Sequence, residues 1–190
     1  MVRRDRRRQF VGALVGVLAL VAVGSGPTTA AAAAGPAAQL ASVRAANDGT
    51  FDRVVFEFEG SAVPTVSLSG PVANTGSVPA DPSDQPVPVA GAQVVTVVMH
   101  GAVASWQEGT YAGPTSITPT GTLNVAQVVE TGDFEAVLTW VIGTRSSTTP
   151  SVTVLTDPVR VVVDIPHPST IATTPAAPSS GVASSPGYTG

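Results

Sequence analysis

The chain has 190 residues, among them 17 Pro, 19 Gly and no Cys, with 12 % charged and 43 % hydrophobic residues. This length allows one domain with tails and is too short for two full-sized domains. The absence of Cys excludes a disulfide scaffold, thiolate metal ligands, a Cys nucleophile and a lipid-anchored cysteine.

The charge is distributed unevenly along the chain. All nine basic residues are Arg, five of them lie within the first eight positions, and the formal net charge is −4. The chain after residue 34 keeps four Arg against twelve Asp and Glu, which is a net charge of −8. Phosphate recognition needs clustered basic residues, so we expect no nucleic-acid partner.

Residues 1–34 have the pattern of a secretion signal. An Arg-rich start precedes an apolar run of 14 residues, Phe10–Val23, and a small-residue stretch with A-x-A cleavage sites follows. The run is shorter than the about 20 residues that cross a bilayer as a helix, so we expect cleavage after Ala34 and no stable membrane span. Arg7 and Arg8 also fit a twin-arginine signal, which leaves the Sec and twin-arginine routes both open. The expected location is secreted or cell-wall associated.

After a short linker at 35–39, residues 40–167 alternate β-branched runs with turn signals and show no sustained helical period. This pattern predicts an all-β domain of about eight short strands, which suits a β-sandwich or a partly closed barrel. The expected strands are Leu40–Ala45, Arg53–Glu59, Thr65–Leu68, Gln93–His100, Asn124–Glu130, Phe134–Ile142, Ser151–Leu155 and Val159–Ile165.

Alternation within these runs predicts the core. In Arg53–Glu59 the apolar residues share one face, whereas Gln93–His100 is apolar on both faces and is expected to be a central, covered strand. The expected core residues are Val54, Phe56, Phe58, Val95, Val97, Leu138, Trp140, Val161 and Val163.

Turn-forming residues predict the connections. Asn47-Asp48-Gly49 and Thr131-Gly132-Asp133 are expected to be hairpin turns, because Gly and Asn accept a positive φ at little cost. The Pro-rich stretch Gly70–Gly91 and the stretch Ser105–Thr122 are expected to be long ordered loops or irregular edge segments. Residues 168–190 are rich in Pro, Ser, Thr and Ala and uncharged, which predicts a disordered tail.

Several motifs between Leu40 and His167 resemble the AMIN-like domain family of exported actinobacterial proteins. The motifs are VRAANDGTFDRVVFEFEG, PVPVAG, YAGP, VVETGDFEAVLTWVIG and LTDPVRVVVDIPH. The family is distantly similar to the AMIN domains of peptidoglycan amidases and pilus secretins, which are β-sandwiches that target proteins to the cell wall or septum. The resemblance implies a β-sandwich, and a wall-binding role is carried over only from a fold-level relative. The chain departs from the family pattern at Thr50, where Gly is common, and in the segment after Gly60, which lacks an aromatic strand.

The sequence offers little catalytic chemistry. There is no G-x-S-x-G motif and no H-E-x-x-H motif, and the two histidines, His100 and His167, lie 67 positions apart. Glu57 and Glu59 share a strand face, which is typical of a solvated face, although a glycosidase pair is the alternative. Asp81 and Asp84, three positions apart, supply too few oxygen ligands for a calcium site. We therefore expect no enzyme, catalytic residue, metal or cofactor.

Two arginines could serve recognition. Arg53 and Arg160 could each hold an anionic glycan or a peptide carboxylate through bidentate hydrogen bonds. Alternatively, Asp52, Asp157 and Asp164 could pair with them and tie neighbouring strands together.

Two aromatic residues of the Ser105–Thr122 stretch are further candidates for ligand binding. The rings of Trp106 and Tyr111 could stack on sugar rings if they lie in an exposed loop, whereas Trp140 is expected to be core. The expected ligand-binding surface therefore combines Trp106 and Tyr111 with Arg53 or Arg160 nearby.

Two functions fit these observations. The first is an exported, non-catalytic envelope-binding module whose partner is peptidoglycan, another cell-wall glycan or an envelope protein. The alternative is a structural or assembly protein that binds an envelope protein through an exposed sheet edge.

Overall fold

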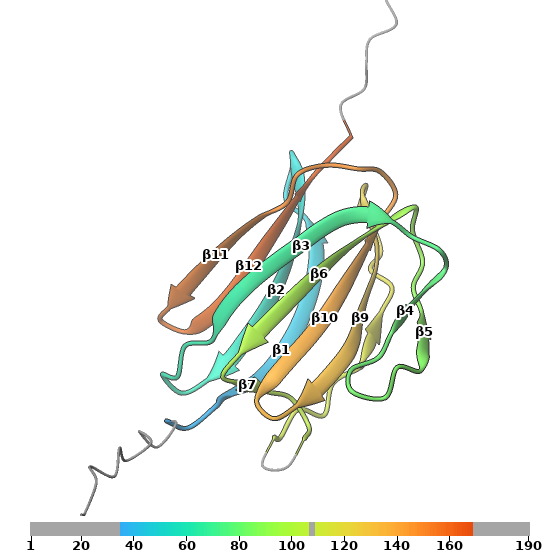
Figure 1. Ribbon diagram of the computed structural model, residues 1–190. Coiled ribbons are helices and arrows are strands. Elements are labelled where there is room, and N and C mark those ends of the chain that lie inside the picture. The colour runs from blue at the N-terminus through green and yellow to red at the C-terminus, as the bar shows by residue number, and fades with distance from the viewer. Residues whose placement is uncertain (1–34, 107–108, 169–190) are drawn as a thin grey trace, which may run out of the picture. The chain divides into compact units, whose positions relative to one another are not determined.

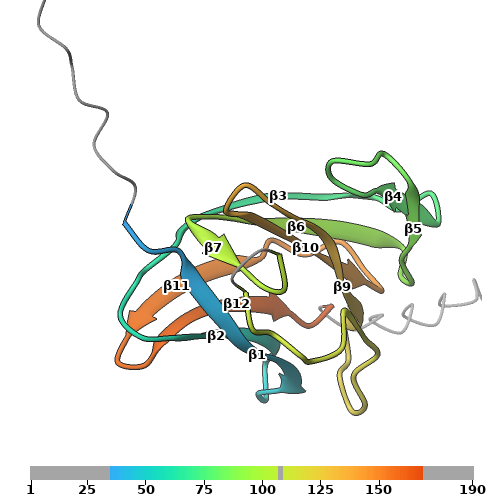
Figure 2. The same cartoon turned by 90° about the horizontal axis from the view of Figure 1, so that it is seen from below.

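The computed structural model describes residues 35–106 and 109–168. These residues form two five-stranded sheets that face each other and a separate two-stranded sheet (Figures 1 and 2). The all-β class and the β-sandwich predicted from the sequence are confirmed. In this part of the chain no helix has the length and hydrophobicity needed to span a membrane. The predicted signal at 1–34 and the tail from residue 169 onwards lie outside the described residues.

The first sheet has the order β11-β12-β2-β1-β7. Its neighbours pair antiparallel, except that β1 and β7 are parallel. The strands are β1 (Ala38–Asn47), β2 (Phe51–Glu59), β7 (Ala102–Val103), β11 (Ser151–Thr156) and β12 (Val159–Pro166).

The second sheet has the order β3-β6-β10-β9-β8, and all its neighbours pair antiparallel. A small hairpin of β4 and β5 forms the third sheet. The strands are β3 (Thr65–Ala73), β4 (Ser77–Pro79), β5 (Pro86–Pro88), β6 (Gln93–His100), β8 (Ser116–Ile117), β9 (Val125–Phe134) and β10 (Val137–Thr144).

All eight predicted strands are present, within a few residues of their expected bounds. The remaining four strands are two or three residues long. Such short pieces carry no readable alternation, because one period of a strand already takes two residues.

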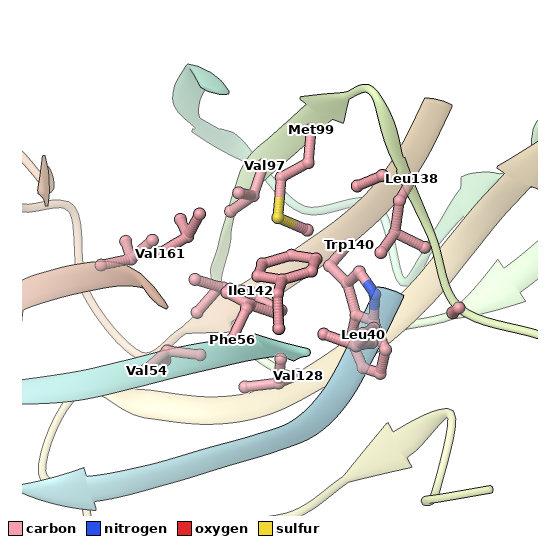
Figure 3. Packing of buried hydrophobic residues seen from close by; sticks show 14 of the residues in the cluster. Leu40, Val54, Phe56, Val97, Met99, Val128, Leu138, Trp140, Ile142 and Val161 are labelled. Atoms are coloured by element: carbon pink, nitrogen blue, oxygen red, sulfur yellow. The ribbon is translucent and has the colours of Figure 1, made fainter. Parts of the chain in front are cut away.

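The core lies between the two large sheets (Figure 3). The ring of Phe56 from β2 meets the indole of Trp140 from β10 edge-on, with 5.7 Å between ring centroids. All nine core residues predicted from the sequence are buried. The alternation in β2 is therefore the pattern of a strand with one face on the core.

One predicted turn is wrong. Residues Thr131, Gly132 and Asp133 lie inside β9, and the hairpin turn falls at Glu135 and Ala136, whose φ angles are 50° and 57°. A Cβ at Gly132 would lie 3.0 Å from Cβ of Asp81, so this glycine allows a close approach rather than a turn.

The turn predicted between β1 and β2 is confirmed. Gly49 has a φ of 81°, and its N–H donates to the Oδ1 of Asn47 at 2.8 Å. The asparagine side chain thus replaces a backbone acceptor and fixes the turn locally.

The Pro-rich stretch Gly70–Gly91 begins in the edge strand β3, at its register shift, and continues into the β4–β5 hairpin, so the expectation of an irregular edge segment or ordered loop is confirmed in part. Its β4–β5 hairpin packs on the outer face of the second sheet (Figure 2), where a second apolar cluster forms. This cluster buries Val94, so β6 is covered on both faces at this residue, as the sequence predicted. The cluster consists of Val89, Val94, Val129 and Val141, with Val78 and Val87 packed against it.

Candidate functional site

A pocket of about 380 Å³ lies at the end of the sandwich where β1 begins and the β9–β10 turn lies. It combines an indole ring, an amide, a carboxylate and apolar side chains. Its lining consists of Pro36, Ala37, Gln39, Val103, Trp106, Glu135 and Ala136.

Trp106 is held from two sides. Its half-buried ring packs edge-on against Phe134, with 5.1 Å between ring centroids and 65° between the ring planes. Its backbone N–H donates to the Oδ2 of Asp133 at 2.7 Å. The same oxygen accepts the N–H groups of Ala104 and Ser105, at 3.2 and 2.7 Å. One carboxylate on β9 therefore fixes the backbone that carries the indole.

The β9–β10 turn, which also lines the pocket, is fixed as well. The carbonyl of Ala136 accepts the N–H of Gly101 at 2.7 Å and that of Ala102 at 3.2 Å. Glu135 and Ala136 both have positive φ, which for residues other than glycine carries a conformational cost. The sheet pairing on both sides of the turn holds it in this conformation, and the exposed Glu135 reaches the pocket as a result.

Tyr111 does not belong to the surface as the sequence suggested. Its side chain is 8 % exposed and meets Trp140 edge-on at 6.3 Å, while its hydroxyl donates to the carbonyl of Pro114 at 2.9 Å. The ring is part of the core and offers no free face to a ligand. Of the two loop aromatics, only Trp106 lines the pocket.

Buried polar atoms gather next to this end of the core. Among the described residues, the buried Oε1 of Gln39, Oε2 of Glu130, Oδ1 of Asp133 and Nε1 of Trp140 have no hydrogen-bond partner. Burial raises the pKa of Glu130 to about 7, and the charge of Asp133 adds to this shift. Native proteins satisfy nearly all such atoms, so this group marks an unusual region of the fold.

Gln39, Glu130 and Asp133 were not among the candidate site residues predicted from the sequence. Glu130 is paired with Trp140, and Asp133 with Leu138, so both acids lie on the inward face of β9. The alternation does indicate that Glu130 faces inward, because it follows the buried Val128 by two positions and so shares its face. The predicted turn at Thr131-Gly132-Asp133 hid this pattern.

Arg53 lies far from the pocket and is already paired. Its guanidinium donates to both carboxylate oxygens of Asp164, at 2.8 and 3.0 Å, and lies 3.0 Å from a carboxylate oxygen of Asp48. Gln39 is paired with Glu59, six residues further along β2, so Arg53 lies about 20 Å away at the opposite end of the strand. The structural role considered for Arg53 and Asp164 is confirmed.

Asp52 has a different role from the one considered. Its carboxylate accepts the N–H groups of Leu123, Asn124 and Val125, at 3.1, 2.6 and 2.7 Å, and contacts the Nε2 of His167 at 3.0 Å. It pairs with no arginine within the residues that the structure describes. This side chain is fully buried, and its contacts close the end of the sandwich opposite the pocket.

Arg160 lies on the outer face of the first sheet, opposite Glu57. Its Nε donates to the carbonyl of Pro158 at 3.4 Å, while Glu57 accepts two hydrogen bonds of 3.1 Å from Arg44. Within residues 35–106 and 109–168, neither Arg160 nor Asp157 forms an ion pair. The four candidate residues therefore do not form one site.

No metal centre is evident in the described part of the chain, where no group of three His, Cys, Asp or Glu residues could hold an ion. Asp81 forms an isolated bridge with Gly132, and Asp84 lies in an exposed turn with a φ of 56°. His100 is exposed at the end of β6, while His167 contacts Asp52. These residues have structural or solvent-facing positions.

Comparison with known proteins gives one finding. A family model described as the AMIN-like domain matches residues 38–167, which include every strand of both large sheets. No curated protein and no solved structure matches the chain significantly.

Proposed function

The chain belongs to the AMIN-like domain family, and from this premise we propose that it is an exported, non-catalytic module that binds a cell-wall glycan such as peptidoglycan. The family suggests an envelope-associated module in general. The glycan, the export and the absence of catalysis are our proposal. The binding site we propose is the Trp106 pocket.

The observation that carries the proposal is the accessible, immobilised indole of Trp106. Sugar rings have apolar faces that pack on aromatic rings, and hydroxyl groups that need polar partners. The amide of Gln39 and the carboxylate of Glu135 lie in the same pocket and can supply these partners. A pocket of this composition fits a neutral or amide-bearing sugar better than an anion.

Preorganisation further supports the pocket. The backbone of Trp106 is tied to Asp133, and its ring rests on Phe134, so the indole loses little freedom when a ligand stacks on it. Tyr111 and Arg53 are outside the proposed site, because the former is buried and the latter is paired at the far end of β2. Arg160 lies on the outer sheet face and is likewise not included.

The test is co-sedimentation of the protein, purified from cells expressing the full chain, with purified peptidoglycan at increasing concentrations. Trp106→Ala is expected to weaken binding about tenfold, or about 1.4 kcal/mol, because the stacking surface is lost. Val72→Ala is the matched control. Val72 is an exposed apolar residue of β3, and its truncation should leave binding unchanged.

Two results would contradict the proposal. The first is a wild-type protein that does not sediment with peptidoglycan, and the second is a Trp106→Ala variant that binds like the wild type. Urea unfolding of both variants separates a binding defect from a folding defect. If Trp106→Ala unfolds the domain, the indole is a core residue and the pocket is not the site.

The alternative function, an assembly protein that uses a sheet edge, is favoured by a different observation. All six residues of the edge strand β11 are exposed. A proteomic pull-down from the envelope fraction tests it, since an assembly protein should retain a specific protein even when peptidoglycan is digested.

A further inference from the structure

Strand β11 is an open edge of the first sheet. It pairs with β12 on one side only and lies at the outside of the sandwich (Figure 1). Its side chains Val152, Val154 and Leu155 are 36, 37 and 38 % exposed. The strand contains no charged residue and no proline. Proteins normally protect such an edge with charges, proline or bulges, because its free N–H and C=O groups can pair with another strand.

The other edges of the two large sheets lack these properties. The edge strands β7 and β8 have two residues each, which is too short to hold a partner strand. The edge strand β3 is interrupted by a register shift between Ser69 and Val72. Among the described strands, β11 is therefore an edge that is regular along its whole length and has a partner strand on one side only.

We propose that β11 pairs antiparallel with the β11 strand of a second copy of this chain, with Thr153 on the two-fold axis. In this register Val152 faces the second copy's Val154, and Ser151 faces the second copy's Leu155. Each pair joins two odd-numbered or two even-numbered residues. The residues whose N–H and C=O groups point to the open edge therefore face each other, and each side chain stays on its own face of the extended sheet.

The charges on the outer face select this register and a copy of the same chain as the partner. Arg160 lies beside Leu155, and Asp164 lies beside Ser151. Pairing Leu155 with the second copy's Ser151 therefore aligns Arg160 with the second copy's Asp164 in one cross-strand row. Glu57 and Arg53 continue this row at its two ends, so that the charges along it alternate in sign.

The two-fold axis generates the same row twice. The backbones of Arg160 and the second copy's Asp164 are separated by three strand spacings, about 14 Å, across two uncharged side chains. Arg160 has no carboxylate partner among the described residues, and its long side chain can extend over Leu155 toward this acid. If the register were shifted by two residues, Leu155 would face the second copy's Thr153, and Arg160 would lie in a row with the second copy's Val162 instead.

The inner face of the strand also favours self-pairing. Val152 and Val154 lie opposite Val163 and Val161 of β12, whose side chains are in the core. In the dimer these two valines pair with their counterparts and form a continuous apolar strip. Cross-strand pairs of β-branched residues stabilise a sheet, so the exposed valines gain a partner without any rearrangement of the domain.

The absence of Cys allows a direct test of this register. In an antiparallel pair the two Cα atoms are about 4.5 to 5.5 Å apart, which suits a disulfide. Thr153→Cys should therefore form a disulfide-linked dimer with oxidised glutathione, the two thiols being oxidised as glutathione disulfide is reduced. Leu155→Cys alone should not, because it faces the second copy's Ser151. A mixture of the Leu155→Cys and Ser151→Cys variants should form the mixed dimer.

Analytical ultracentrifugation of protein purified from cells expressing the full chain provides the second readout. The wild type should dimerise reversibly. Thr153→Lys should raise the dissociation constant at least tenfold, because two ammonium groups meet on the axis. Val72→Lys places the same charge on another exposed strand and should leave the dimer unchanged. Circular dichroism confirms that both variants are folded.

Three results would overturn the inference. One is a wild-type protein that stays monomeric at every concentration reached. Another is Thr153→Cys that cross-links no better than Leu155→Cys. The third is a monomeric wild type that captures a different envelope protein in a Thr153→Lys-sensitive manner, which would assign the edge to that partner. None of these results bears on Trp106 and peptidoglycan, so the two proposals fail separately.

Discussion

Asp52 and Asp133 close opposite ends of the sandwich in the same way. Each carboxylate accepts the N–H groups of three consecutive residues, 123–125 for Asp52 and 104–106 for Asp133. The first group leads into the beginning of β9, and Asp133 itself lies near the end of that strand. At each end, one buried or partly buried carboxylate therefore accepts the N–H groups of a loop that has no neighbouring strand to accept them.

The two ends differ in how completely the carboxylate is paired. Both oxygens of Asp52 are bonded, and His167 contacts one of them. Burial by itself raises the pKa of Asp52, but the hydrogen bonds from Val125, Asn124, Leu123 and His167 outweigh burial and lower the pKa overall.

At the other end a single oxygen of Asp133 takes all three N–H groups, and its Oδ1 is buried without a partner. Glu130, with its raised pKa, and the Trp106 pocket lie at the same end. One end is therefore satisfied as a structural closure should be. The other keeps unsatisfied polar groups beside the pocket that we propose as the binding site.

The largest expected effect is that of Asp52→Asn. The amide keeps one acceptor oxygen but turns an NH2 group toward backbone N–H donors, which leaves buried donors without an acceptor. We expect a loss of about 3 kcal/mol in the free energy of unfolding at pH 7. Urea unfolding measures it. Asp84→Asn, in an exposed turn, is the control and should change nothing.

The same variant has a pH signature. The folded-state pKa of Asp52 lies below its unfolded value, so its contribution is present above the unfolded pKa and is lost as the pH falls through the folded pKa. The acid branch of the stability profile, below about pH 4, should therefore be flatter in Asp52→Asn. An unchanged acid branch would mean that this carboxylate is not ionised in the folded protein.

Asp133→Asn should cost less, about 1 kcal/mol. Its amide oxygen can keep the three N–H groups of the Trp106 loop, while its NH2 replaces the oxygen that has no partner. The comparison of the two ends fails if this variant is destabilised as strongly as Asp52→Asn in the same urea titration.

Glu130 should give the pocket end a pH dependence of opposite sign. Its pKa rises from 4.5 to about 7 on folding, because of burial and then the charge of Asp133. Its contribution is therefore fully present below pH 4.5 and is lost as the pH rises toward 7. Glu130→Gln should remove this downward slope in thermal unfolding between pH 5 and 7. A slope that persists in the variant would assign it to another group.

The smallest effect is expected for Arg53→Ala, at about 0.5 to 1 kcal/mol. Arg53 follows Asp52 in sequence but lies on the solvent face of β2, and its pairs with Asp164 and Asp48 are half exposed. Such pairs contribute little and are screened by salt. The difference from the wild type should shrink in 1 M NaCl. A loss as large as that of Asp52→Asn would contradict the division between a buried closure and a surface pair.

Much of the fold could be predicted because it rests on local patterns. The alternation of Val54, Phe56 and Phe58 identifies a half-buried strand, and the Asn47-Asp48-Gly49 turn follows from residues that accept positive φ. The turn at Glu135 and Ala136 was missed because neither residue favours positive φ. Sheet pairing holds the turn there, and pairing is a long-range property.

The candidate site depends far more on the tertiary structure. Trp106 and Tyr111 lie five positions apart in one stretch, and nothing in the local sequence predicts which of the two is buried. Tyr111 is buried because it packs on Trp140 of a distant strand, whereas Trp106 lies outside because Asp133 binds its backbone N–H. By itself the sequence determined the class of the fold, its long strands and its core, since alternation and turn chemistry act between near neighbours. Only the tertiary structure decided which aromatic is exposed, which carboxylate is fully paired and which sheet edge stays open, because each depends on contacts between residues far apart in the chain.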